Sequence, residues 1–173
     1  NNDHQDLAII IVAQIIVLFV FLVFNFPRAQ MFLGDSGSYL FGSLVAFNII
    51  KTNNLNPEIS SFFFCILLFY LFFEVFFSFF RKIKQKKSPI KPDSEHLHML
   101  SYKFISFGKI GENYNYLNTL LINFFYCLLV LPSILIKESG VLCKYWFFVL
   151  IFIYIIAYFR LNSFVKKKMI YKH

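Results

Sequence analysis

The stretch from Leu7 to Phe24 reads LAIIIVAQIIVLFVFLVF and decides the class of the fold. It holds one polar residue, Gln14, and no charge. A helix crosses a bilayer with about 20 apolar residues, in a range of roughly 17 to 25, so this run is long enough for one span. Comparable apolar runs follow over residues 62–80, 117–136 and 141–159. We therefore expect an all-α, polytopic membrane protein.

The overall composition indicates the same class. Hydrophobic residues make up 58% of the 173 residues, the mean hydropathy is +0.64 and 26 residues are Phe. A soluble domain of this size cannot hide so much apolar surface in its core. The lipid bilayer is the expected partner of the chain, and binding to a nucleic acid is not expected. We interpret Cys65, Cys127 and Cys143 as buried apolar side chains, because they lie in apolar runs without the spacing of a metal site.

A further run over residues 39–50 is shorter, and two interpretations stay open for it. It is either a tilted span extended to 38–52 or a half-helix that re-enters the membrane. In both cases the basic residues gather in segments 81–109 and 160–172. By the positive-inside rule, that side of the membrane is cytoplasmic.

After its first apolar run the chain breaks into FPRAQMFLGDSGS over residues 26–38. Glycine lets a backbone approach a charged ligand closely, and the carboxylate of Asp35 is a suitable oxygen ligand for Mg²⁺ that carries phosphates. The alternative is an ordinary turn at the membrane surface, in which Asp35 or Ser36 caps the next helix. From these residues alone, both interpretations remain open.

The largest polar loop, residues 81–116, combines cations with a His-Leu-His sequence at 96–98. Cationic side chains beside two histidines are what a site for phosphates would collect. Taken alone, the cations are equally explained as an orientation signal that meets anionic lipid headgroups. His96 and His98 face one side only if the backbone is extended, and they are too few ligands for a zinc site. Lys87 and Lys91 are the last two cations before them in the sequence.

One acid, Glu74, lies inside a predicted span. Ionisable residues within the membrane are functional candidates by default. The alternative is a residue near the interface that pairs toward the cytoplasm, about two turns from Arg81, and we favour this second interpretation.

These motifs together resemble the polyprenyl-phosphate N-acetylhexosamine-1-phosphate transferases of glycosyltransferase family 4, which include phospho-N-acetylmuramoyl-pentapeptide transferase. The resemblance rests on the order and spacing of FNFP at 24–27, FLGDSGS at 32–38, FRK at 80–82, PD at 92–93 and HLH at 96–98. It implies transfer of N-acetylhexosamine-1-phosphate from a UDP-sugar to undecaprenyl phosphate, with Mg²⁺ and release of UMP. It also implies a ten-helix fold, of which this chain is expected to be the C-terminal half with about five spans.

The resemblance also implies roles for individual residues. Asp35 matches the catalytic carboxylate that binds Mg²⁺, Phe32 the aromatic side chain that stacks on uracil, and Asn25 a polar residue near the nucleoside. His96 and His98 match a catalytic histidine motif that faces the donor phosphates. Lys87 and Lys91 are expected to contribute to substrate binding. Charge neutralisation and positioning are what phosphoryl transfer requires, so these residue types fit the implied chemistry.

This mechanism needs Asp35 and the histidines on one side of the membrane, which favours a crossing at 38–52. We therefore expect a single membrane domain over residues 1–173, with five spans and cytoplasmic loops at 25–37 and 81–116. The spans are 7–24, 38–52, 62–80, 117–136 and 141–159. The expected location is the bacterial inner membrane, with the active site and the C-terminus cytoplasmic. Whether the protein forms a homodimer stays open.

The chain also departs from the family pattern. Met99 stands where many members carry a further histidine, and Ser94 stands where many carry an arginine. The paired aspartates of the family's N-terminal half have no counterpart here, because no two acidic residues are adjacent. We expect these 173 residues to be catalytically incomplete alone, and the alternative is an inactive membrane fragment that needs a separate N-terminal half. A transporter or channel with a basic anion path is a third hypothesis. The donor sugar stays open, with a preference for a surface-glycan precursor over peptidoglycan.

Overall fold

The computed structural model describes residues 2–107 and 114–170, with the backbone alone at 169 and 170. The described residues are helical and contain no strand, which confirms the predicted all-α fold class. The chain divides into two units, residues 1–61 and 62–173, and each is described by itself. The single membrane domain expected over residues 1–173 stays a prediction.

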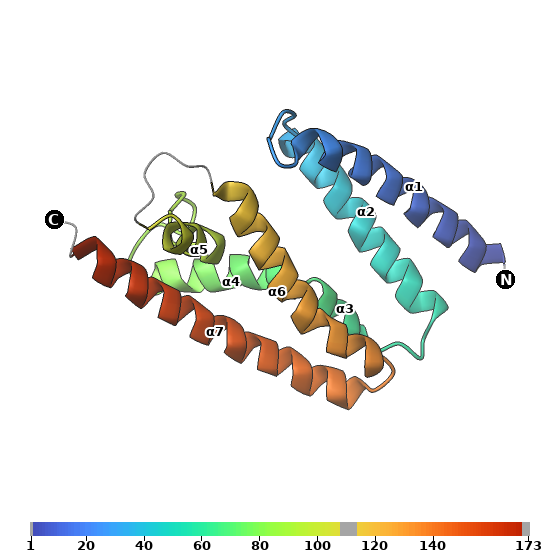
Figure 1. The fold of residues 1–173 in the computed structure, drawn as a ribbon. Helices are drawn as coiled ribbons and strands as arrows, with labels where there is room; N and C mark the ends of the chain where they lie inside the picture. Colours follow the sequence, from blue (N-terminus) through green and yellow to red (C-terminus); the bar gives the residue numbers. More distant parts are fainter. Residues whose placement is uncertain (1, 108–113, 171–173) are drawn as a thin grey trace. The chain divides into compact units, whose positions relative to one another are not determined.

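The first unit is a hairpin of two long helices, α1 (Asn2–Asn25) and α2 (Gly34–Leu55), which run antiparallel from a loop at residues 26–33 (Figure 1). Gln14, the polar residue within the first apolar run, accepts a hydrogen bond from the Asn48 side chain of α2. A polar group among apolar residues is costly without a partner, so this bond ties the two helices together in register.

The second unit begins with a broken helix. α3 (Ser61–Leu67) and α4 (Phe69–Lys84) meet at an angle of 74°. The break frees carbonyl groups, and the hydroxyl of Tyr126 donates to two of them, the Ile66 oxygen at 3.0 Å and the Leu67 oxygen at 2.7 Å. A backbone break at membrane depth is tolerated only where such groups find partners. No residue of the predicted span 62–80 signals the break, since this stretch contains neither proline nor glycine.

Three further helices complete the second unit, the short α5 (Leu97–Ile105) and the long α6 (Asn115–Leu135) and α7 (Gly140–Ile170) (Figure 1). α5 packs against both α6 and α7. The core is largely aromatic, with Phe69, Phe73 and Phe77 of α4 in ring contact with Tyr154 of α7. This packing positions the polar segment between α4 and α5, where the second set of candidate residues lies.

Three helices of the described residues are long and apolar enough to cross a membrane, namely α1, α6 and residues 140–168 of α7. The bent pair of α3 and α4 makes a fourth candidate if it forms one span. The expected count of about five is therefore higher than length and composition support. The difference is α2, which is long enough but carries Asn48, Lys51 and Asn53 near its end. A crossing at 38–52 remains a prediction.

The prediction for the cysteines is only partly right. Cys143 is buried, and its thiol lies 3.2 Å from the Ile136 carbonyl oxygen, to which it donates. Cys65 and Cys127 are exposed. An apolar run does not imply burial in a membrane protein, because many of its apolar side chains face lipid rather than the core.

Candidate functional site

The loop of the first unit is held by Asn25, the last residue of α1. Its side-chain oxygen accepts a hydrogen bond from the Met31 amide at 3.0 Å, and its amide group donates to the Phe21 carbonyl at 3.2 Å. The Asn25 side chain thus fixes the path of the loop back toward α1. This contact gives Asn25 a structural function beside the nucleoside contact that the resemblance implies.

The start of α2 depends on glycine. Gly34 has a φ of +69°, which lies in the left-handed region that side chains disfavour. At Gly37, an added Cβ would lie 2.7 Å from the side chain of Leu33. Gly34 is therefore required by the backbone, whereas a side chain at position 37 would require the Leu33 side chain to move. The two glycines bring the N-terminal end of α2, with its free amide groups, directly after the loop.

Phe32 and Asp35 project from this loop and helix start without partners of their own. The side chain of Phe32 is 96% exposed, which is unusual for a large apolar ring. Asp35 lies in the first turn of α2, is exposed, and makes no hydrogen bond or ion pair within the described residues. The N-cap residue is Leu33, and no side chain makes a cap hydrogen bond. Capping by Asp35 or Ser36, the alternative interpretation of this sequence, is therefore wrong.

In the second unit, His96 precedes the first turn of α5 and is held by a buried acid. Its Nδ1 lies 3.0 Å from Oε1 of Glu74, which also accepts the Leu97 amide at 3.0 Å. The other oxygen of Glu74 accepts a hydrogen bond from the Tyr154 hydroxyl of α7. Glu74 thus pairs with the polar segment that follows α4, as the second interpretation of its sequence position anticipated.

His98 lies in the first turn of α5 and stacks on His96, with ring centroids 5.7 Å apart and an angle of 17° between the rings. The turn is fixed through its backbone, because the His98 carbonyl accepts from Asn118 at 2.9 Å and from Ser101 at 3.1 Å. The His98 side chain is exposed and makes no hydrogen bond within the part of the chain that the structure describes. The two rings stack although only the backbone of His96 is extended, while that of His98 is helical.

Two buried cations of α4 hold the segment that leads to His96. Arg81 donates to Asp93 at 2.8 Å and to Glu95 at 2.9 Å. Lys82 donates to the carbonyl groups of Pro89 and Lys91, at 3.2 and 2.7 Å. Both cations are 8% exposed in their side chains. This network makes residues 85–96 a braced segment rather than a free loop.

The network also affects the acids that take part in it. Partial burial alone would raise the pKa of Asp93, but the hydrogen bond from Arg81 and the nearby charges of Arg81 and Lys82 lower it below the ordinary 3.8. Burial would also raise the pKa of Glu95. The hydrogen bond from Gln85 and the nearby charges of Lys87 and Arg81 outweigh this effect and hold the pKa below 4.5. Both groups therefore stay ionised at neutral pH.

The two lysines expected to bind substrate differ in their surroundings. Lys87 is about half exposed and lies 3.7 Å from Glu95. Lys91 is exposed, and its side chain makes no hydrogen bond or ion pair with described residues, while its carbonyl group accepts from Lys82. Of the two, Lys91 is the cation that remains available to an anion.

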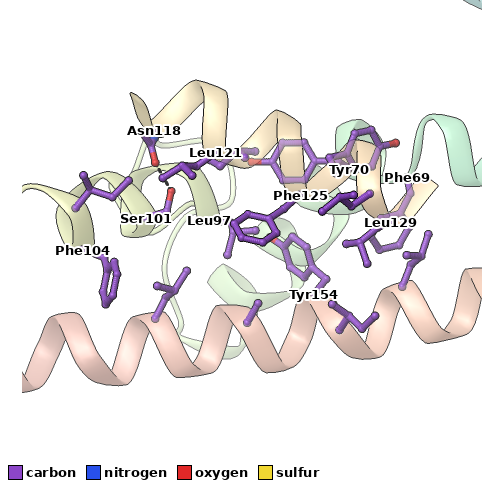
Figure 2. A pocket seen from close by; sticks show the side chains of 18 residues that line it. Phe69, Tyr70, Leu97, Ser101, Phe104, Asn118, Leu121, Phe125, Leu129 and Tyr154 are labelled. Atoms are coloured by element: carbon purple, nitrogen blue, oxygen red, sulfur yellow. Dashed lines mark hydrogen bonds between the residues drawn. The ribbon is translucent and has the colours of Figure 1, made fainter. Parts of the chain in front are cut away.

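An apolar cavity of ≈560 Å³ lies between α4, α5, α6 and α7 (Figure 2). Its walls include Phe69, Tyr70, Phe125 and Leu129, and the hydrogen-bonded pair of Ser101 and Asn118 lies at its edge (Figure 2). The volume is in the range of roughly 300 to 1,000 Å³ that small-molecule sites occupy. Such walls suit an apolar ligand or chain and offer few groups for a polar one.

The candidate residues thus belong to two separate units. Asn25, Phe32 and Asp35 lie in the first, and Lys87, Lys91, His96 and His98 lie in the second. Within residues 2–107 and 114–170, no group of three acidic, histidine or cysteine side chains could hold a metal by itself. Mg²⁺ is often held by one or two carboxylates together with waters and substrate phosphates. The free carboxylate of Asp35 fits that requirement as one protein ligand.

Sequence reasoning missed the residues that organise the second unit. It gave Arg81 and Lys82 no function beyond the basic cluster, and it named no partner for Glu74. A usable signal was present for the two cations, since Asp93 and Glu95 are opposite charges within one short segment. No local signal links Glu74 to Tyr154, which is 80 residues away.

Comparison with known proteins supports the resemblance found in the sequence. Residues 1–53 match the sequence model of the family described as Glycosyl transferase family 4. An undecaprenyl-phosphate alpha-N-acetylglucosaminyl 1-phosphate transferase of Thermotoga maritima is 32% identical over 136 residues, which are 79% of this chain and 39% of that protein. A probable undecaprenyl-phosphate N-acetylglucosaminyl 1-phosphate transferase of Bacillus subtilis is 28% identical over 142 residues, 79% of this chain and 37% of that protein.

A phospho-N-acetylmuramoyl-pentapeptide-transferase of Helicobacter hepaticus is 48% identical over 52 residues, 30% of this chain and 14% of that protein. The chain therefore matches well under half the length of these relatives. No solved structure matches the chain.

Proposed function

We propose that the protein, whose residues 1–53 match the sequence model of glycosyl transferase family 4, transfers N-acetylhexosamine-1-phosphate from a UDP-sugar to undecaprenyl phosphate. An oxygen of the acceptor phosphate would form a bond to the phosphorus that carries the sugar. The bond between that phosphorus and the bridging oxygen would break, and UMP would leave with the bridging oxygen. The proposed setting is a bacterial inner membrane, with both sets of candidate residues facing the cytoplasm.

The observation that carries the proposal is the loop of the first unit. It exposes a large ring and a free carboxylate three residues apart, on a backbone that Gly34 and Asn25 hold in shape. We propose that Phe32 stacks on the uracil and that Asp35 holds Mg²⁺ together with the donor phosphates. When bound there, Mg²⁺ would neutralise the negative charge of the donor pyrophosphate.

In the second unit, the proposed contributors are imidazoles and cations. His96, His98 and Lys91 offer N–H donors to phosphate oxygens, and charge-assisted bonds of this kind are among the stronger ones in proteins. The cavity between α4 and α7 has the apolar walls that a segment of the isoprenoid acceptor would require. The family's paired aspartates are not in this sequence, so the proposed reaction needs carboxylates from outside these 173 residues.

The experiment is a transfer assay with the full-length protein in membranes, radiolabelled UDP-N-acetylhexosamines and undecaprenyl phosphate. We expect label in an organic-extractable lipid and an equal amount of UMP. The variant F32A should raise KM for the donor by about 5- to 150-fold if stacking on the base contributes roughly 1–3 kcal/mol. The control F47A removes a half-exposed ring from α2 and should leave KM unchanged. Release of UDP instead of UMP, or no lipid product with any donor, would refute the proposed reaction.

A further inference from the structure

Glu74 makes an unusual set of contacts for an acid among aromatic side chains. It is 9% exposed and accepts hydrogen bonds from donors of two other parts of the second unit. Oε1 receives the Leu97 amide and Nδ1 of His96, and Oε2 receives the Tyr154 hydroxyl. A buried carboxylate without partners is strongly destabilising, and these three donors remove that cost.

The contact with the Leu97 amide alone has a simple explanation. Leu97 is the first residue of α5, and a carboxylate is favourable at a helix N-terminus. A neutral amide or hydroxyl group could accept that hydrogen bond as well. The contact with His96 is different, because it concerns which nitrogen of the imidazole carries the proton.

The geometry determines what each ring nitrogen of His96 can do. An ionised carboxylate only accepts hydrogen bonds, so Nδ1 must carry a proton to pair with Glu74. Nε2 lies 3.6 Å from Oδ1 of Asp93, which is too long for a hydrogen bond. Both oxygens of Asp93 are already engaged, one by Arg81 and the other by the Glu95 amide. Nε2 is therefore the nitrogen that stays available.

We propose that Glu74 is a positioning residue, whose carboxylate holds the Nδ1 proton of His96 and keeps Nε2 free for a phosphate oxygen of the nucleotide-sugar donor. The second half of this statement rests on the proposed function. Tyr154 belongs to the same arrangement, because its hydroxyl fixes the other oxygen of Glu74 from α7. The ring of His96 thus takes its orientation from α4 and α7 as well as from its own segment.

The first test does not depend on activity. In detergent, the protein labelled with ¹⁵N-histidine should show a hydrogen-bonded ring N–H signal that persists in H98A and disappears in H96A. The signal should disappear in E74A and shift in E74Q, since an amide oxygen still accepts but carries no charge. Y154F should shift the signal, whereas Y158F, one turn further along α7, should not. A signal unchanged in E74A and E74Q would overturn the proposal.

The second test measures coupling in the transfer assay. E74Q keeps the acceptor for the Leu97 amide and should still lower kcat by about 10- to 100-fold, the size of loss seen when the carboxylate partner of a metal-bound histidine is changed. In an H96A background the same change should cost less than about threefold, because Glu74 acts through His96. Equal losses in both backgrounds would make Glu74 a structural cap of α5. If the wild-type protein transfers nothing, the proposed function fails, while the ring N–H signal still decides whether Glu74 sets the proton position of His96.

Discussion

Replacing Arg81 with alanine should release the segment that carries the histidines. Arg81 makes two charge-assisted hydrogen bonds, to Asp93 at 2.8 Å and to Glu95 at 2.9 Å, and lies over the Tyr158 ring at 5.9 Å. Each such bond contributes about 1.5–3 kcal/mol, and breaking a buried pair costs about 3–5 kcal/mol because it leaves the partner charge unpaired. We expect R81A to lower the stability of this segment by about 3 kcal/mol, since the two acids are partly exposed to solvent and Lys82 remains near Asp93.

The cost should appear as local opening rather than as global unfolding. A loss of about 3 kcal/mol corresponds to roughly a 100-fold increase in the open population of residues 85–97. Hydrogen exchange followed by mass spectrometry should detect it in two amides whose bonds depend on this segment, Lys87 to the Lys82 carbonyl and Leu97 to Glu74.

The matched control is R160A, which removes an exposed arginine from α7. It should leave the exchange of residues 85–97 unchanged. Peptides from α6 should exchange alike in R81A and in the wild-type protein. Exchange of residues 85–97 in R81A within about threefold of wild type would refute the view that this network braces the segment.

Three further predictions concern other contacts. The pKa values of Asp93 and Glu95 are lowered in the folded protein from 3.8 and 4.5, so the stability that these acids contribute is fully present above pH 4.5 and is lost as the pH falls through the lowered values. The melting temperature in detergent should therefore fall as the pH drops from 4.5 to below 3.8 in wild type, and much less in R81A. Y126F leaves two carbonyl groups at the α3–α4 break without a donor and should lower the free energy of unfolding by about 1–3 kcal/mol. Y145F, which changes an exposed ring, should lower it little. Equal losses would show that these carbonyl groups find other hydrogen-bond donors. Q14L should weaken the α1–α2 hairpin by about 0.6 to 1.7 kcal/mol, and in an N48L background the same change should have no further cost, as a double-mutant cycle on unfolding would show.

The sequence predicted the features that depend on composition. The apolar runs gave the helical membrane class, whereas residues 34–37, expected to lie in a loop, form the first turn of α2. The membrane class could be predicted because the length of an apolar run is a local property.

The features that sequence reasoning missed depend on contacts between distant residues. The break at Leu68 has no proline or glycine to announce it, and it persists because Tyr126, about 60 residues later, satisfies the freed carbonyls. Lys51 and the nearby asparagines make α2 less apolar than its length suggests, so length and composition alone do not decide whether it crosses the membrane. The contact of Glu74 with Tyr154 depends on the packing of α4 against α7, which no local feature of the sequence predicts.

The central claim is that Asp35 is a functional carboxylate and not a feature of the helix start. UMP release by the full-length protein, at saturating undecaprenyl phosphate and with Mg²⁺, tests it most directly in D35N. Asp3 gives a matched control, because it is also exposed in the first turn of its helix. We predict that D35N loses activity by about 100-fold or more while D3N keeps it, since losing one group that stabilises the transferring phosphate typically costs about 10² to 10³ in kcat. Turnover in D35N equal to that of D3N, with both proteins inserted in the membrane, would contradict the account.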